Sequence, residues 1–133
     1  MAPSTEIITP DEIVVRHIPG GSLFVKPPPV GPSITSANFR LRKEEEYISV
    51  GRLSFHSDEE IIAITGGDRS KGSLAGWCRV SDLIAAGFRV VPKTLPHYPG
   101  HAGIFGSEAW PLTEKRTQQY LASLFRFTPV SHG

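Results

Sequence analysis

The segment GWCRVSDLIAAGFRVVPKTLPHYPGHAGIFG, residues 76–106, contains the clearest succession of secondary-structure signals in the chain, and the fold prediction starts from it. Its segments WCRV and FRVV contain β-branched and aromatic residues and predict two short strands. Between them, Ser81 is a favourable N-cap for a helix over residues 81–86, and Gly87 predicts a left-handed end to that helix. A helix this short cannot carry a parallel crossover, so the pattern predicts a compact corner beside a sheet.

The second half of this stretch predicts a loop and a further strand. Residues 95–101 (LPHYPGH) contain two prolines and a glycine, which exclude a helix. His97 and His101 therefore cannot share a helical face, although they are four residues apart. Residues 102–105 predict a short strand. A loop that is held by prolines and carries histidines and Tyr98 is a place where binding residues occur.

The composition indicates one globular domain. The chain has 133 residues, of which 39% are hydrophobic, which suits a domain with its own core. A net charge of +1 makes no strong case for nucleic-acid or membrane binding. Cys78 is the one cysteine, which excludes an internal disulfide and fits a reducing compartment. We expect a cytoplasmic protein, since residues 1–10 lack signal-peptide features and no apolar run approaches the ~20 residues of a membrane span.

The remaining segments predict a single α+β domain over residues 11–133, behind a flexible tail over residues 1–10. Residues 13–18 (IVVRHI) are typical of an interior strand, because their apolar side chains would face both sides of the sheet. Residues 47–50 (YISV) predict another strand. Together with the strands of residues 76–106, these segments predict a mixed, mainly antiparallel sheet of about five short strands with two or three helices.

Capping signals mark two further helices. Ser57 and Glu60 form a capping box for a helix over residues 58–65, which Gly66 would end. Thr113 is the expected cap of the last helix, over residues 113–126. The apolar stripe of that helix, at helical spacing, consists of Tyr120, Leu121, Leu124 and Phe125.

Three segments before residue 47 predict weaker elements. Residues 23–25 (LFV) indicate an edge strand, and residues 34–41 (ITSANFRL) indicate a weak strand or a turn followed by a strand. The proline-rich residues 26–32 predict an extended loop with polyproline character. Such a loop is most often plain surface, although a proline-reading domain could also bind it.

The spacing of possible metal ligands does not indicate a metal site. His97 and His101 would need Cys78, His17 or Asp82 to complete one, and this spacing is not that of a zinc module. We therefore expect no metal site, and the residues point to no particular cofactor. Cys78 is expected to be a buried structural thiol rather than a nucleophile.

Arg16, Ser49 and His101 form the candidate catalytic set, because all three fall on or beside predicted strands. The planar guanidinium of arginine can bind a phosphate through two parallel hydrogen bonds. A serine hydroxyl can orient a ribose or phosphate, and histidine can transfer protons near neutral pH. The alternative is structural: Arg16 pairs with an acidic residue, Ser49 caps a strand end and His101 supports its loop. His17 follows Arg16, and strand neighbours point to opposite faces, so the two should not share a pocket unless the strand bulges or ends there.

Four short motifs carry a resemblance. They are R-H-I at residues 16–18, S-x-x-F at 36–39, I-S-V at 48–50 and H-A-x-I at 101–104. Over most of its length the chain resembles a group of small uncharacterised bacterial proteins that share this pattern. That resemblance implies a bacterial protein and brings no activity with it.

A narrower resemblance covers Arg16–His17 and Ser49 alone. It is to ADP-ribosyltransferase-like and RNA 2′-phosphotransferase-like domains, which are small NAD-binding folds with an Arg- or His-bearing first strand and a later strand that carries a serine. This resemblance implies a nucleotide-type substrate. The chain departs from those families in lacking an assured catalytic glutamate, and Glu108 is the one placed candidate.

Two functions are compatible with these residues. The first is an enzyme or binding protein for a nucleotide or nucleotide-bearing substrate, in which Arg16 holds phosphate, Ser49 orients the sugar and His101 serves as acid or base. The second is a non-catalytic accessory, immunity or inhibitor-type subunit. Its partner protein would bind the proline-rich loop of residues 26–32, or the His97–His101 loop with Tyr98 and Trp110. The candidate binding residues of the chain are His17, His97, Tyr98 and Trp110.

Overall fold

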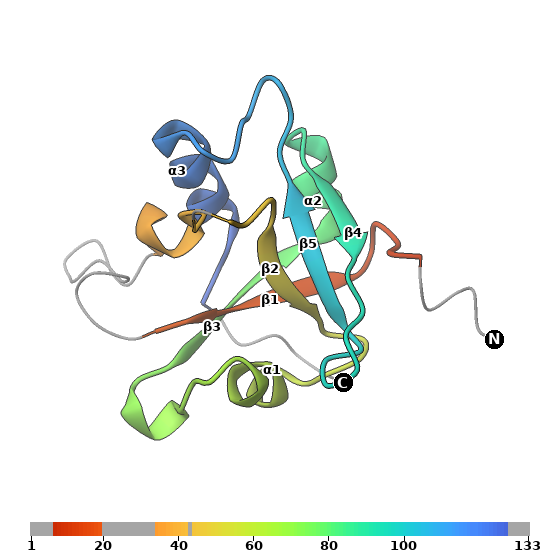
Figure 1. Ribbon diagram of the computed structural model, residues 1–133, viewed down its shortest axis with the longest axis vertical. Helices are drawn as coiled ribbons and strands as arrows, with labels where there is room; N and C mark the ends of the chain where they lie inside the picture. The colour runs from red at the N-terminus through yellow and green to blue at the C-terminus, as the bar shows by residue number, and fades with distance from the viewer. Residues whose placement is uncertain (1–6, 20–33, 43, 128–133) are drawn as a thin grey trace.

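Five short strands form one sheet in the computed structural model, which describes residues 7–19, 34–42 and 44–127 (Figure 1). The strands are β1 (Ile13–Ile18), β2 (Ile48–Arg52), β3 (Leu74–Arg79), β4 (Arg89–Pro92) and β5 (His101–Phe105). Their order across the sheet is β3-β1-β2-β5-β4, and each of these pairings is antiparallel. The predicted α+β fold is confirmed, with an antiparallel rather than a mixed sheet among the described strands.

β1 lies inside the sheet and is covered on both faces, as its apolar pattern predicts. Val14 packs into the larger core with side chains of α2 (Val80–Ala85) and α3 (Lys115–Leu124). Val15 packs into a smaller cluster with Ile61 of α1 (Asp58–Ile64). Because successive strand residues face opposite sides, α1 lies on the face of the sheet opposite to α2 and α3.

The capping box of α1 and two of the glycines act as the sequence predicts. The Ser57 hydroxyl accepts a hydrogen bond from the Glu60 N–H, and the Glu60 carboxylate accepts one from the Ser57 N–H. This confirms the capping box of α1. Gly66 and Gly87 have φ angles of 85° and 101°, which confirms their left-handed conformation at the helix ends.

Two predicted caps are wrong. Ser81 does not cap α2, because the chain passes directly from β3 into a helix that begins at Val80. The Ser81 N–H instead donates to the Pro10 carbonyl. Thr113 does not cap α3, which begins later and has Glu114 at its N-cap without a side-chain cap. At both places the helix begins at a residue other than the one that follows the best local capping residue.

The strand predicted over residues 34–41 is also wrong. The segment contains η2 (Ser36–Phe39), a 3₁₀ helix. Its Phe39 is fully buried against Phe125, with ring centroids 5.0 Å apart. Packing against the end of α3 therefore overrides a weak strand propensity. The segments predicted over residues 23–25 and 26–32 lie outside the described residues.

The part of the predicted tail that is described contacts the domain. The Ile7 carbonyl accepts a hydrogen bond from Arg52 Nη2 at 3.0 Å. Together with the Pro10 contact, this attaches residues 7–10 to β2 and α2. Within the described residues, no helix has the length and apolar character needed to cross a membrane.

The pairing of β1 with β2 is much shorter than its pairing with β3. β1 and β3 are in register from Ile13 to Ile18. β1 and β2 are in register only at Val14↔Arg52 and Val15↔Gly51. The two strands therefore have a closed end, at these two pairs, and an open end beyond them, which carries Arg16, His17 and Ser49.

Candidate functional site

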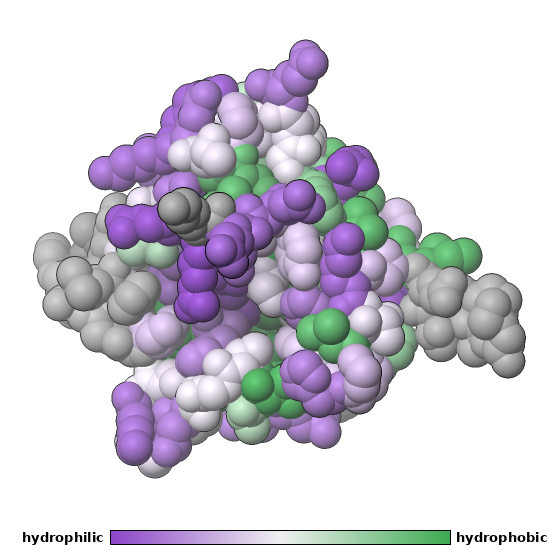
Figure 2. Space-filling view, in the orientation of Figure 1, coloured by the Kyte–Doolittle hydropathy of each residue, from purple (hydrophilic) through white to green (hydrophobic). Residues whose placement is uncertain are grey.

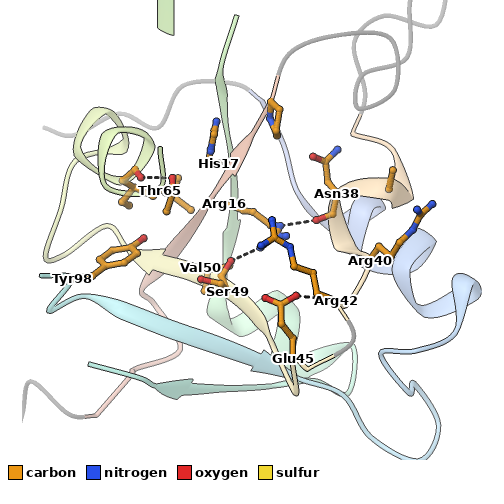
Figure 3. A pocket seen from close by; sticks show the side chains of 14 residues that line it. Arg16, His17, Asn38, Arg40, Arg42, Glu45, Ser49, Val50, Thr65 and Tyr98 are labelled. Carbon is orange, nitrogen blue, oxygen red and sulfur yellow. Dashed lines mark hydrogen bonds between the residues drawn. The ribbon is translucent and has the colours of Figure 1, made fainter. Parts of the chain in front are cut away.

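A cavity of about 430 Å³ lies at the open end of the β1–β2 pair (Figure 3). Figure 2 shows hydrophilic side chains gathered on the face of the molecule over these strands. The cavity wall combines strand residues with residues of the segment around η2, of α1 and of the β4–β5 loop. The polar side chains that line it are Arg16, His17, Asn38, Arg40, Arg42, Glu45, Ser49, Thr65 and Tyr98.

Arg16 lies at the centre of this wall and is half-buried. Its Nε donates to the Asn38 carbonyl at 2.7 Å, and its Nη1 donates to the Ser49 carbonyl at 2.6 Å. The guanidinium takes the place of the β1 backbone, which no longer pairs with β2 at this point. Within the described part of the chain, no carboxylate lies within ion-pair distance of Arg16, and no hydrogen bond leaves its Nη2.

Burial lowers the pKa of Arg16 to about 10, while the nearby charge of Glu45 raises it and that of Arg42 lowers it. A guanidinium with this pKa stays protonated at neutral pH. The site therefore holds a permanent positive charge beside the cavity, and that charge attracts anions.

Ser49 and His101 form a hydrogen-bonded pair on neighbouring strands. Ser49 Oγ and His101 Nε2 are 2.6 Å apart, and His101 Nδ1 is 2.9 Å from the Lys93 carbonyl oxygen. A carbonyl only accepts hydrogen bonds, so Nδ1 carries the proton and donates it. In the neutral imidazole, Nε2 is then the acceptor for the Ser49 hydroxyl.

His101 is buried, with 6% of its surface exposed. This burial lowers its pKa below the ordinary value of 6.5, although the hydrogen bond to Lys93 raises it; the charges of His97 and Lys93 lower it further. The imidazole is therefore neutral at pH 7 and available as a proton acceptor. In this state it can remove a proton from Ser49.

Tyr98 closes the cavity from the loop between β4 and β5. It is 3% exposed, and its hydroxyl has no hydrogen-bond partner among the described residues. Burial raises the pKa of this phenol to about 12, so it remains a donor at neutral pH. Its ring lies 5.1 Å from that of His101, and Gly51 leaves room for its hydroxyl, which a Cβ there would overlap.

His17 lines the same cavity as Arg16, which the sequence predicted only for a strand that bulges or ends at this point. The reason is that β1 separates from β2 at this point, so both side chains border the gap. His17 Nε2 is 3.0 Å from Ser73 Oγ, which also accepts a hydrogen bond from the Asp68 N–H. Burial and the charge of Arg16 lower the pKa of His17.

The other predicted site residues lie elsewhere. His97 is exposed in the β4–β5 loop and does not line the cavity. Trp110 is half-buried and stacks with Tyr120, with ring centroids 4.4 Å apart. Glu108 is exposed in the loop after β5 and is also absent from the cavity wall.

The sequence reasoning missed the arginines that follow η2. Arg40 and Arg42 both line the cavity, and the Arg42 N–H donates to the Glu45 carboxylate at 2.8 Å. The F-R-L-R pattern of residues 39–42 was the available signal, because it repeats a basic residue at a strand-like spacing next to the S-x-x-F motif.

Cys78 is a buried thiol, as predicted, with 2% of its surface exposed. Burial and the charge of Asp82 raise its pKa to about 12, which makes it a poor nucleophile at neutral pH. Among the described residues, no group of three or more His, Cys, Asp or Glu side chains could hold a metal ion.

Comparison of the chain with protein-family models, with curated proteins and with solved structures gives no match. The resemblances to small bacterial proteins and to ADP-ribosyltransferase-like domains therefore stay predictions. The geometry of the site is the basis for inferring what the protein does.

Proposed function

We propose that this protein binds a nucleotide or a nucleotide-bearing substrate in the cavity between β1 and β2, and that it acts on it there. The observation that carries this proposal is the environment of Arg16. The guanidinium lies beside a cavity, anchored by two backbone carbonyls and without an acidic partner among the described residues.

The charges around the cavity favour an anion. The described lining residues include three arginines (Arg16, Arg40 and Arg42) and one carboxylate, that of Glu45. A phosphate matches the planar fork of a guanidinium, and Nη2 of Arg16 makes no hydrogen bond to another described residue. The buried Tyr98 hydroxyl, likewise without a partner in the described part of the chain, is a second donor in the same wall.

The size and the remaining polar groups suit a nucleotide better than inorganic phosphate alone. A volume of about 430 Å³ falls within the range of small-molecule sites. The side chains of Asn38 and Thr65 line it beside Ser49, and they can hydrogen-bond sugar hydroxyls or base edges. In this arrangement Arg16 holds a phosphate, and His101 serves as acid or base next to it.

The alternative of a non-catalytic interaction protein has less support. Tyr98 cannot serve as an exposed anchor, because 3% of its surface is accessible and its hydroxyl faces inward. Trp110 is engaged with Tyr120 and Arg116 in its own domain. The proline-rich loop of residues 26–32 lies outside the described residues. This alternative would be favoured if a partner protein bound the chain and no nucleotide did.

Binding is tested by thermal shift and calorimetry with ADP, ADP-ribose, NAD and inorganic phosphate. We expect at least one nucleotide to raise the melting temperature, and Arg16→Lys to weaken its binding by about 10- to 100-fold, because lysine cannot replace a fork of hydrogen bonds to a charged group. The matched control is Arg89→Lys. Arg89 is also a strand arginine near a phenylalanine ring (Phe105), but it is exposed and lies away from the cavity. No shift with any of these ligands, or equal effects of the two substitutions, would contradict the proposal.

A further inference from the structure

We propose that Ser49 is a nucleophile, that His101 is its general base, and that the Lys93 carbonyl orients His101. The substrate class is a phosphoester whose phosphate is held by Arg16. This inference rests on the proposed phosphate-binding function and adds the reaction. It assigns Ser49 a role beyond that of contacting a sugar.

The first support is the chain of hydrogen bonds from Ser49 to Lys93. Nucleophile and base are 2.6 Å apart, and base and orienting carbonyl are 2.9 Å apart. This is the arrangement of nucleophile, base and orienting group that covalent catalysis requires. The antiparallel pairing of Ser49 with Gly103 and of Gly51 with His101 places both side chains on one face of the sheet.

The second support is an internal comparison, because the chain contains another Ser–His pair. His17 and Ser73 are 3.0 Å apart, but within the described residues no orienting group is recorded on His17 Nδ1. Ser73 Oγ also accepts from the Asp68 N–H, and Ser73 does not line the cavity. The Ser49–His101 pair has both imidazole nitrogens engaged and reaches the cavity through Ser49.

The third support is that Ser49 lines two cavities. One is the arginine-lined cavity, whose wall also includes Glu45. The other is a cavity of about 320 Å³, which Ser49 and His101 line together with Tyr47 and the acidic residues 44–46. A phosphate bound at Arg16 would therefore be adjacent to Ser49, with the leaving group directed toward the acidic side. Carboxylates there disfavour an anionic leaving group, so the leaving group is neutral or cationic.

The reaction balances with water as the second reactant. Ser49 Oγ attacks phosphorus and transfers its proton to His101 Nε2, while the bond from phosphorus to the leaving oxygen breaks. His101 then returns the proton to the leaving oxygen. In the second half, water attacks phosphorus and gives a proton to His101 Nε2, while the bond from phosphorus to Ser49 Oγ breaks. Ser49 then takes this proton, which came from water, from Nε2. Arg16 and the Tyr98 hydroxyl are placed to stabilise the charge that develops on the phosphoryl oxygens.

The test is covalent labelling of the full chain with a fluorophosphonate, which reacts at phosphorus with activated serines. Intact mass and peptide mapping of the unsubstituted protein should show one label, on Ser49. Ser49→Ala should abolish it, and His101→Gln should slow it by at least about 100-fold through loss of the general base. Ser73→Ala, in the other Ser–His pair, is the matched control and should label at the rate of the unsubstituted protein. The labelling rate should also fall as His101 becomes protonated in acid.

Mapping the label in the unsubstituted protein keeps the test decisive even if a variant fails to fold. No label on Ser49, a label elsewhere, or an unchanged rate in a folded His101→Gln variant would overturn the proposal. If nucleotide binding depends on Arg16 but Ser49 is not labelled, the role of Ser49 as a nucleophile is rejected and the proposed nucleotide-binding function is kept. If Ser49 is labelled but no nucleotide binds, the role of Ser49 is kept and the nucleotide-binding function is rejected.

Discussion

The closed and open ends of the β1–β2 pair each hold an arginine, and the two arginines have different partners. At the closed end, Arg52 is 3% exposed and donates from Nε and Nη2 to the two carboxylate oxygens of Glu12, at 2.8 Å each. At the open end, Arg16 donates to two backbone carbonyls and has no carboxylate partner among the described residues. The charge of Arg52 is therefore neutralised within the fold, while the charge of Arg16 remains available to a ligand.

The largest expected effect comes from breaking the ion pair at the closed end. Glu12→Ala should lower the free energy of unfolding by about 3–5 kcal/mol, because it leaves the Arg52 charge buried without its carboxylate. Arg16→Met should cost less, about 1.5–3 kcal/mol, because it removes hydrogen bonds from a charged group to carbonyls beside an open cavity. Urea denaturation of both variants measures the contrast. Equal losses would mean that Arg16 is a structural residue like Arg52.

A smaller effect is expected from filling the space at the boundary between the two ends. A Cβ on Gly51 would overlap the Tyr98 hydroxyl and lie 2.8 Å from Ile61 Cδ1. Gly51→Ala should therefore destabilise the fold by about 1–3 kcal/mol through overpacking. In a Tyr98→Phe background the same substitution should cost less, because the overlapping oxygen is gone. Denaturation of the single and double variants gives the coupling free energy between the two positions. If the two changes in unfolding free energy simply add in the double variant, the predicted overlap is contradicted.

Removing the Tyr98 hydroxyl alone should have a smaller effect on stability. Tyr98→Phe deletes a buried oxygen that has no hydrogen-bond partner among the described residues, so the fold should be unchanged or up to about 1 kcal/mol more stable. Phosphate-ligand affinity should fall by about 5- to 10-fold, because a donor in the cavity wall is lost. Thermal melts and calorimetry on the same variant separate the two effects. Clear destabilisation would show that the hydroxyl has a structural partner.

The smallest expected effect is on the pH dependence of stability. Burial lowers the pKa of His101, so the folded state binds its proton less readily than the unfolded state does. The stabilisation is therefore complete above the unfolded pKa of about 6.5 and is lost as pH falls through the lowered folded value. The difference in unfolding free energy between the unsubstituted protein and His101→Gln should shrink from pH 8 to pH 5. A constant difference would indicate that His101 has the same pKa in both states.

Local patterns predicted much of the fold. Residues 13–18 form β1 with the predicted bounds, because a run that is apolar on both faces suits an interior strand. The capping box at Ser57 and the left-handed Gly66 and Gly87 were predicted for the same kind of reason, since each depends on a few adjacent residues. The helix starts at Ser81 and Thr113 were wrong, because α2 and α3 have Arg79 and Glu114 at their N-caps instead and neither has a side-chain cap.

The candidate site was predicted in part. Arg16, Ser49 and His101 were identified by their chemistry, and the structure brings them together through hydrogen bonds of Ser49 to both of the others. Arg40 and Arg42 were missed because their segment lacks a regular element that would have placed them. His97 and Trp110 were included because they occur in loops, but their side chains do not reach the cavity.

Residue type and near neighbours were enough to predict the bounds of β1, the capping box of α1, the left-handed glycines at helix ends, and which side chains can bind phosphate or move protons. The point at which β1 separates from β2 could be known only from the three-dimensional structure. That separation depends on the register between two strands that are far apart in the sequence, since Arg16 and Ser49 are 33 residues apart. It also depends on the packing of η2 against α3. The three-dimensional structure also shows that Arg16 has carbonyl partners while Arg52 has a carboxylate partner. The separation of the strands is the physical basis of the cavity, and the partners of Arg16 are the basis of its positive charge.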